Sequence, residues 1–328
     1  MAVPGQSFGT QAAGAYFTNQ TLSKELRSVA QPLARFRQFC RKDPQFGKRS
    51  GSKLLFNKLK NIGATASTGA IIGEGQPIPR DGFEITQGEC IAVPSGQAIP
   101  WTEEYEVQSE FEPRDPIESR IVDHMAKSLD YRASVPFLNG EVVYTPLSGT
   151  NSSLHHDGTG GTIADRDFKL SDVKNMADTA RSGRYGFTGG TERLPPMPPF
   201  DGQNYILLAD VKLARGLKDD SSWENAQYYG DPEKLFSGET GRIYGVRVIE
   251  ENHILETFSG ISANLAQGIF FGDDPAIECV VTPEEVRVDI PRDFGRDMAM
   301  AWYYLGGFSE VWSHASDGDN RMIRIGGT

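Results

Sequence analysis

The sequence predicts an α+β fold with an antiparallel or mixed sheet, and two observations support that class. Helical patterns concentrate in the middle of the chain, most clearly at residues 115–135 and 171–182. After residue 243 the pattern changes to five runs rich in Val, Ile and aromatic residues, which Asp, Gly and Pro turns separate. A chain of 328 residues with this pattern can bury a substantial core in one large domain or two ordinary ones.

The chain opens with an uncharged segment followed by a strongly basic one. Residues 1–23 carry no charge and are rich in Gly, Ala, Gln and Thr, so we expect an arm that cannot fold alone. Residues 24–60 carry a net charge of +9, whereas residues 61–328 carry −20. The basic segment can bind nucleic acid or lie on the acidic body of a neighbouring copy, and the strong fixed charge of that body favours the second interpretation.

Residues 53–112 predict a long β-hairpin that projects from the body. The segments "SKLLFNKLKN" and "EEYEVQSEFE" have strand character, and "GFEI" and "ECIAV" between them alternate polar with apolar residues. The connection "GATASTGAIIGEGQPIPRDG" is long and rich in Gly and Pro, which is uncommon in a compact domain unless the loop has a function. A hairpin with so little apolar surface of its own requires partner chains.

The clearest helix in the sequence follows this hairpin, at residues 115–135. Asp115 can cap it, Pro116 suits its first position, and Glu118 completes a capping box. Pro136 marks its end. Apolar residues at a spacing of four predict the buried face: Ile117, Ile121, Met125 and Leu129.

A loop at residues 139–161 leads to the second helix. Ser171 is the expected cap of that helix, and Gly183 is the expected terminator. Farther along, "NYILLAD" predicts a short buried strand whose Asp210 can cap the next helix, and "SSWENAQYYGD" predicts another short helix.

The stretch "LFSGETGRIYGVRVIE" starts like a phosphate-binding loop and ends like a strand. It lacks the Lys-Ser/Thr pair of a P-loop and precedes a strand, whereas phosphate-binding loops lead into a helix. We therefore expect Gly238 and Gly241 to turn the chain, and Ile243, Val246 and Val248 to build a sheet.

The sequence offers no convincing catalytic, cofactor or metal site. Asp273 and Asp274 in "FFGDDP" are the strongest exception, because adjacent carboxylates at a hairpin tip can hold the metal ions of a nucleotidyltransferase. The same residues also make an ordinary turn. Residues 155–157, "HHD", match no familiar metal-ligand spacing. No apolar run is long enough to span a membrane.

Two further groups of residues bear on function. Cys40, Cys90 and Cys279 are far apart and form no C-x-x-C pair, so we expect buried free thiols and folding in a reducing compartment. The Gly-rich and aromatic composition of the C-terminal region would also suit a carbohydrate-binding or tail structural module, although aromatic residues in strands are usually core.

The order of the predicted parts resembles that of tailed-bacteriophage major capsid proteins with the Hong Kong 97 fold. More specifically, "LARGLKDDSSWENAQYYGDPEKLFSGETGRIYGVRVIEENHI" resembles an axial-domain segment of the subgroup related to the coliphage N-four capsid protein. In that subgroup a helix, a short "Y-G" turn and a "G-x-x-G-R-I-x-G-V-R" strand follow in this order. The segments "LSDVKNMADTAR" and "IFFGDDPAIEC" are similar to its preceding helix and its returning strand. The rest of the chain matches by order only.

The resemblance implies a capsid protein that assembles as hexamers and pentamers into an icosahedral head, with no reaction to catalyse. It implies assembly in the cytoplasm of a bacterial host, residence in the virion, and non-specific contact with packaged double-stranded DNA. A portal, and decoration or scaffolding proteins, are further partners that it implies. The implied parts are an N-terminal arm, an extended loop with flanking strands, a spine helix of the peripheral domain, an axial domain and peripheral return strands, at residues 1–52, 53–112, 113–138, 139–275 and 276–328.

Two sets of contact residues follow from this reading. The extended loop is expected to lie over a neighbouring subunit through apolar and charged residues, namely Ile71, Ile72, Glu74, Ile78, Arg80 and Phe83. The arm is expected to contact a neighbour or DNA through Arg35, Phe36, Arg37, Arg41, Lys42, Lys48 and Arg49.

Overall fold

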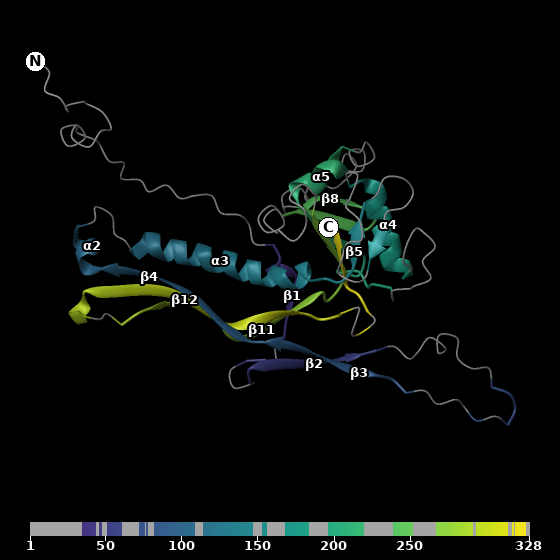
Figure 1. Cartoon of the computed structure of the whole chain (residues 1–328), viewed down its shortest axis with the longest axis horizontal. Helices are drawn as coiled ribbons and strands as arrows, with labels where there is room; N and C mark the ends of the chain where they lie inside the picture. The colour runs from purple at the N-terminus through teal and green to yellow at the C-terminus, as the bar shows by residue number, and fades with distance from the viewer. Residues whose placement is uncertain are drawn as a thin grey trace, which may run out of the picture.

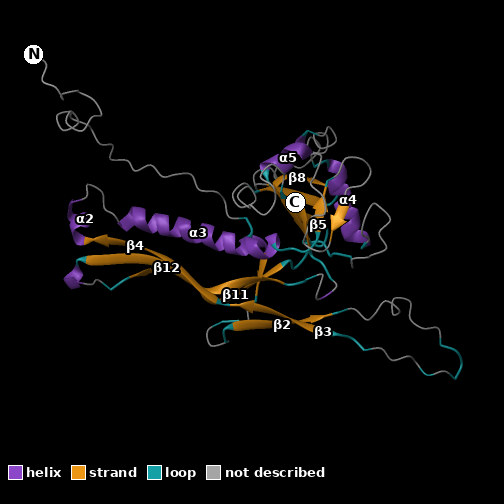
Figure 2. Cartoon of the chain, viewed as in Figure 1, coloured by secondary structure: helices purple, strands orange, loops and turns teal. Residues whose placement is uncertain are grey.

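The chain forms an elongated molecule with two sheets placed end to end and a hairpin beside them (Figures 1 and 2). A long sheet and a long helix make one end, and a wider sheet with two described helices makes the other. The computed structural model describes residues 35–43, 46–47, 51–60, 72–75, 77, 82–108, 114–146, 153–155, 168–183, 196–219, 239–251, 267–290, 293–313, 317 and 319–325.

The long sheet has four strands in the order β1-β11-β12-β4. The first pair is parallel and the other two are antiparallel. Two predicted strands, "AIECVV" and "EVRVDIP", form one continuous strand, β11, with irregular register in its middle. The bounds are β1 Cys40–Lys42, β11 Ala276–Val288, β12 Asp297–Glu310 and β4 Val93–Thr102. A short 3-10 turn, Asp293–Gly295, precedes β12.

Helix α3, Arg114–Leu138, lies along this sheet (Figure 1). The predicted helix is confirmed, but its predicted ends are wrong. It begins at Arg114, so Asp115 lies inside the helix and does not cap it, and it continues through Pro136 for two more residues. Its predicted apolar residues all belong to one core cluster with Trp302 and Tyr304 of β12. The strand aromatics are therefore core residues, as the sequence indicated.

The second sheet contains seven described strands in the order β6-β5-β13-β10-β7-β9-β8. Two of these strands lie within residues 139–161, where the sequence predicted only a loop. The last strand of the chain pairs with β10 and β5 in this sheet and not in the long one. The bounds are β5 Val143–Thr145, β6 Ser153–His155, β7 Tyr205–Ala209, β8 Glu239–Ile243, β9 Val246–Glu250, β10 Gly268–Phe271 and β13 Met322–Ile325.

Both faces of this sheet are buried. Leu207, Val248 and Phe270 point to one face, where they pack with residues of α4, Leu170–Ser182, and α5, Val211–Lys218. The opposite face packs against the C-terminal end of α3 and the start of the described chain. A sheet covered on both sides carries nearly continuous apolar strands, and β7 is buried along its whole length.

The ends of the two helices test the predicted caps. Asp210 caps α5, because its carboxylate accepts the backbone N–H of Leu213 at 2.7 Å. Gly183 ends α4 with a left-handed φ of 66°, as predicted. The prediction that Ser171 caps α4 is wrong: the helix starts one residue earlier, and Asp172 accepts the backbone N–H of Lys169 at 2.9 Å. The short helix predicted from "SSWENAQYYGD" lies outside the described residues.

The glycine-rich stretch makes a hairpin, but its turn falls later than predicted. Tyr244 and Gly245 have φ values of 53° and 75° and connect β8 to β9. Gly241 lies inside β8 next to a register irregularity, so its assignment to the turn is wrong, and Gly238 lies outside the described residues. Val246 and Val248 are buried in the sheet as expected.

The predicted hairpin base is a separate two-stranded sheet of β2, Lys53–Leu59, and β3, Ile85–Ile91, on the side of β11 away from α3 (Figure 1). Its strand β3 crosses β12 at Gly307, where an added Cβ would lie 2.0 Å from the carbonyl oxygen of Ile91. The strand predicted from "EEYEVQSEFE" is wrong for its described part, which is the helix α2, Glu103–Gln108.

Candidate functional site

The β2–β3 hairpin has one face turned to the body and one face turned outward. Residues that are directly opposite in an antiparallel pair share a face. Leu54 pairs with Cys90 and Phe56 pairs with Gly88, and these pack inward. On the outer face lie Leu55, Leu59, Ile85 and Ile91, and we call these residues, together with the exposed Phe83 just before β3, the outer apolar face.

The outer apolar face is unusually open for so small a sheet. Leu59 and Phe83 are 64% and 63% exposed. The polar residues of this face pair with each other, since Lys53 binds Glu89 at 2.9 Å and the Gln87 amide donates to the Asn57 side-chain oxygen at 3.0 Å. Clustered apolar side chains in water are the usual sign of a protein–protein contact.

Three of the predicted loop residues lie in the described part of the chain. Ile72, Glu74 and Phe83 are all exposed, and nothing in the described chain covers them. Ile71, Ile78 and Arg80 lie outside the described residues. The role of all six in contact with a neighbour stays a prediction.

The sequence reading missed the strand residues of the same face, Leu55, Leu59, Ile85 and Ile91. A signal for two of them was present. The run "KLLFNKL" has apolar residues at both even and odd positions, which indicates a strand with apolar side chains on both faces. One face meets the subunit's own body, and no residue that the structure describes covers the other.

Residues 35–42, which we call the arm root, are held by their own subunit. The carboxylate of Asp130 on α3 accepts the backbone N–H groups of Arg35, Phe36 and Arg37 at 3.0, 2.8 and 3.0 Å. Asp130 itself is only 2% exposed. The ring of Phe36 is fully buried, with its centroid 5.6 Å from that of Phe137.

Arg37 completes this attachment through two carboxylates of β11. Its guanidinium binds Glu278 at 2.9 Å and Glu284 at 2.8 Å. The hydrogen bonds from Arg37 lower the pKa of Glu284 to about 2. Although burial opposes its charge, hydrogen bonds to Glu284 and Glu278 raise the pKa of Arg37 above its ordinary value. The guanidinium therefore stays charged and bound at any ordinary pH.

These contacts correct part of the predicted arm. Phe36 and Arg37 are committed to their own subunit and are not available to a neighbour or to DNA. Arg41 and Lys42 lie on β1 with side chains 72% and 60% exposed, and each is within 4.0 Å of a carboxylate of its own chain, on Asp274 and Glu278 respectively. The backbone of Arg35 is bound to Asp130, and its side chain is half-buried. Lys48 and Arg49 lie outside the described residues.

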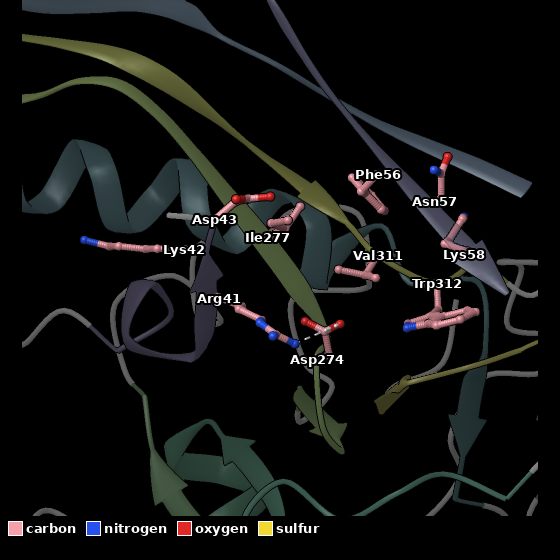
Figure 3. A pocket seen from close by; sticks show the side chains of 10 residues that line it. All are labelled: Arg41, Lys42, Asp43, Phe56, Asn57, Lys58, Asp274, Ile277, Val311 and Trp312. Atoms are coloured by element: carbon pink, nitrogen blue, oxygen red, sulfur yellow. Dashed lines mark ion pairs between the residues drawn. The ribbon is translucent and has the colours of Figure 1, made fainter. Parts of the chain in front are cut away.

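An open cavity of about 410 Å³ separates β1 from β2 (Figure 3). Arg41 and Asp274 face each other across one side of it, and Phe56 and Trp312 lie on the other. Lys58 at its edge is nearly buried and bound to Asp317. The lining is made of Arg41, Lys42, Asp43, Phe56, Asn57, Lys58, Asp274, Ile277, Val311 and Trp312.

Asp273 and Asp274 form a tight turn between β10 and β11. The backbone N–H of Asp273 donates to the carbonyl of Pro198 at 2.9 Å, and Asp274 has a φ of 53°. Burial raises the pKa of Asp274. Among the described residues, no third His, Cys, Asp or Glu side chain joins them in a group that could hold a metal ion. The hypothesis that Asp273 and Asp274 form the metal site of a nucleotidyltransferase therefore gains no support from the described residues.

The strand aromatics and the cysteines have structural roles. The indole N–H of Trp302 on β12 donates to His124 on α3 at 3.1 Å. The three cysteines are buried and free, as predicted. In the described part of the chain, no helix combines the length and the apolar character that crossing a membrane requires.

Comparison with known proteins places this arrangement in a class. No protein-family model and no curated protein sequence matches the chain. Solved structures do match it. The chain is similar to a protein in the head structure of Helicobacter pylori bacteriophage KHP40, with a TM-score of 0.71 and 14% identity over 99% of this chain and 100% of that chain.

Two other phage structures give the same result. For the acid-stable capsid of Helicobacter pylori bacteriophage KHP30, the TM-score is 0.69 at 14% identity, over 99% of this chain and 100% of that chain. For the capsid of Ralstonia phage GP4, the TM-score is 0.65 at 15% identity, over 99% and 97% of the two chains. The chain therefore has the Hong Kong 97-like fold of phage capsid proteins, which confirms the predicted fold class.

Proposed function

We propose that this chain is the major capsid protein of a tailed double-stranded DNA bacteriophage, which assembles as hexamers and pentamers into an icosahedral head. The observation that carries this proposal is the coverage of the structural match, which spans 99% of this chain and 100% of that chain for KHP40. A match of two whole chains supports a shared architecture from the arm to the last strand. It does not depend on a single common domain.

The outer apolar face supplies the physical reason for assembly. Burying apolar surface stabilises association by about 25 cal/mol per Å² before the costs of ordering are subtracted. We propose that this face, together with Ile71, Ile72, Glu74, Ile78, Arg80 and Phe83, lies over a neighbouring subunit. The rival carbohydrate-binding or tail module gives no account of why an apolar hairpin face is left open.

For the arm, we propose contact with neighbours by the residues that its own subunit does not bury. Arg41 and Lys42 are exposed at the edge strand β1, and Lys48 and Arg49 follow in the sequence. Residues 61–328 of each copy carry −20, so an acidic neighbouring surface is a stronger fixed partner than DNA. Packaged DNA would then meet the inner surface only non-specifically.

The remaining expectations belong to the same proposal. They include a structural protein without catalytic activity, assembly in the host cytoplasm, and contacts with a portal and with decoration or scaffolding proteins. The relation to the N-four subgroup rests on the quoted segments alone. We propose the five-part division of the chain as it stands above, except that β13 joins the axial domain because it pairs within the seven-stranded sheet.

Negative-stain electron microscopy and sedimentation of the purified full chain test this function directly. We expect closed shells, or hexamers and pentamers, from the unchanged chain. A double variant, Leu59→Ser with Phe83→Ser, removes much of the outer apolar face, and we expect folded subunits that no longer form shells.

Asn57→Ser is the matched control, because Asn57 is an exposed polar residue on the same face of the same strand. It should assemble like the unchanged chain. Soluble monomers from the unchanged chain under all assembly conditions would contradict the proposed function. Normal shells from the double variant would contradict only the role of the hairpin.

A further inference from the structure

Two of the buried thiols lie in direct contact. The sulfur of Cys90 on β3 lies 2.9 Å from the sulfur of Cys279 on β11, and both residues are fully buried. Their separation in the sequence, 189 residues, is large, so the contact exists only because the hairpin packs on the long sheet. Cys40 is also buried, but its sulfur faces the carbonyl of Phe36 at 3.8 Å.

The surrounding packing holds the two sulfurs together. Both thiols belong to the small core that joins the hairpin to the long sheet, with Phe46, Ile277 and Val311. The register partner of Cys279 on β12 is Gly307, which has no side chain, and this absence lets β3 approach. A side chain at Gly307 would meet the β3 backbone, so the space between the thiols is set by the fold.

We propose that Cys90 and Cys279 form an intrasubunit disulfide when the protein meets a peroxide, and that this bond fastens the hairpin to β11. A disulfide requires two sulfurs that can approach to about 2.05 Å with little backbone movement. The two thiols are free and in contact in the reduced protein.

The contact also determines which thiol reacts first. The Cys90 thiol donates a hydrogen bond to the Cys279 sulfur, and this bond lowers the pKa of Cys279. The same bond, together with burial, raises the pKa of Cys90. Because the thiolate is the nucleophile, this direction favours Cys279 as the initial reactant and Cys90 as the thiol that resolves the intermediate.

The chemistry balances with hydrogen peroxide as the oxidant. The Cys279 thiolate attacks one peroxide oxygen, so that an S–O bond forms, the O–O bond breaks and hydroxide leaves. The Cys90 sulfur then attacks the sulfenic sulfur of Cys279, so that the S–S bond forms, the S–O bond breaks and a second hydroxide leaves. The two thiol protons convert both hydroxides to water. Each sulfur loses one electron, and peroxide is reduced to two waters.

The open cavity of Figure 3 and the core around the thiol pair have side chains in common. Phe56, Ile277 and Val311 line the open cavity of Figure 3 and also belong to the core cluster that contains the thiols. Peroxide is close to water in size, so small fluctuations of these side chains admit it. Bulky disulfide reagents are excluded by the same packing.

Peptide mapping of the full-length protein tests the inference. The native protein is treated with hydrogen peroxide, quenched with catalase, unfolded in an alkylating reagent and digested without reductant. We expect one disulfide-linked peptide pair containing Cys90 and Cys279, and a fall in alkylatable thiols from three to one. A reductant should restore all three.

Cys40→Ala is the matched control, because Cys40 is buried but has no thiol within contact distance. It should form the same linked peptide, whereas Cys90→Ser should leave Cys279 without a disulfide partner. Three alkylatable thiols after peroxide, a bond involving Cys40, a bond between two subunits, or sulfinic acid on Cys279 without a cross-link would each overturn the inference. The map of the unchanged chain decides the question even where a variant fails to fold.

Discussion

The seven-stranded sheet buries apolar residues on both of its faces, whereas the β2–β3 hairpin buries them on one face only. In the sheet, Leu207, Val248 and Phe270 have no exposed surface, and both faces are covered by the same chain. In the hairpin, one face packs on the body and the other leaves Leu59 and Phe83 mostly exposed. The sheet therefore stabilises the subunit, whereas no described residue of the subunit covers the outer apolar face, and in the proposed shell a neighbouring subunit would cover it.

A Phe→Ala substitution in each of the two regions should separate these roles. We expect the largest loss in the free energy of unfolding from the substitution in the sheet. Phe270→Ala removes a fully buried ring that stacks on Tyr205 with a centroid distance of 5.2 Å. We expect a loss of about 3–5 kcal/mol in the free energy of unfolding, because the surrounding sheet cannot close the cavity. Denaturant unfolding of unassembled subunits measures this loss. A change below about 1 kcal/mol would mean that the sheet is not the stable part.

Asp130→Ala tests whether the arm root contributes to the stability of the subunit, as the seven-stranded sheet does, or is dispensable for it, as the outer apolar face is expected to be. It removes the acceptor of three backbone N–H groups, so we expect a loss of about 3 kcal/mol and rapid proteolysis before residue 40. Asp123→Ala, which breaks a half-buried pair with Arg120 on the same helix, is the control and should cost less than about 1 kcal/mol. Equal effects from the two variants would argue against a special role for Asp130.

A smaller and pH-dependent effect is expected at Glu284. Its folded pKa of about 2 lies below the ordinary 4.5, so its ion pair stabilises the folded state above pH 4.5 and ceases to do so as the pH falls to about 2. Because the carboxylate is partly exposed, we expect Glu284→Gln to cost only about 1 kcal/mol at neutral pH. Urea unfolding of both proteins between pH 2 and pH 6 should show the difference shrinking toward low pH.

The smallest effect on stability is expected in the hairpin. Phe83→Ala removes a ring that is already in water, so unfolding of the unassembled subunit should change by less than about 0.5 kcal/mol. The same variant should reduce shell yield, which sedimentation measures. A large loss of subunit stability would place Phe83 in a core that the folded chain does not show.

Local signals explain what could be predicted from the sequence. The cap at Asp210, the terminator at Gly183 and the apolar spacing of α3 each act within a few residues of the chain. The resemblance of short segments added the fold class, which the structural matches confirm. The long hairpin was also predicted, because alternation and glycine content are local properties.

Distant contacts explain what was missed. "EEYEVQSEFE" alternates like a strand, but the N–H of Glu103 donates to the carbonyl of Arg296 at 2.9 Å, and three acidic residues in its first turn favour a helix. Likewise the basic arm seemed free for partners because Asp130, Glu278 and Glu284 are remote in the sequence. No local pattern connects Arg37 to those three carboxylates.

The crossing of β3 over Gly307 has a consequence for the proposed head as a whole. With an added Cβ only 2.0 Å from the Ile91 carbonyl, the two strands touch backbone to backbone, and the angle of the hairpin is set inside one subunit. Each subunit of the proposed shell would thus hold its hairpin at an inclination that its own fold determines. A Cβ at Gly307 would push the β3 backbone away from β12, so we expect Gly307→Ala to change the inclination of the hairpin and with it the fit between neighbouring subunits of the proposed shell.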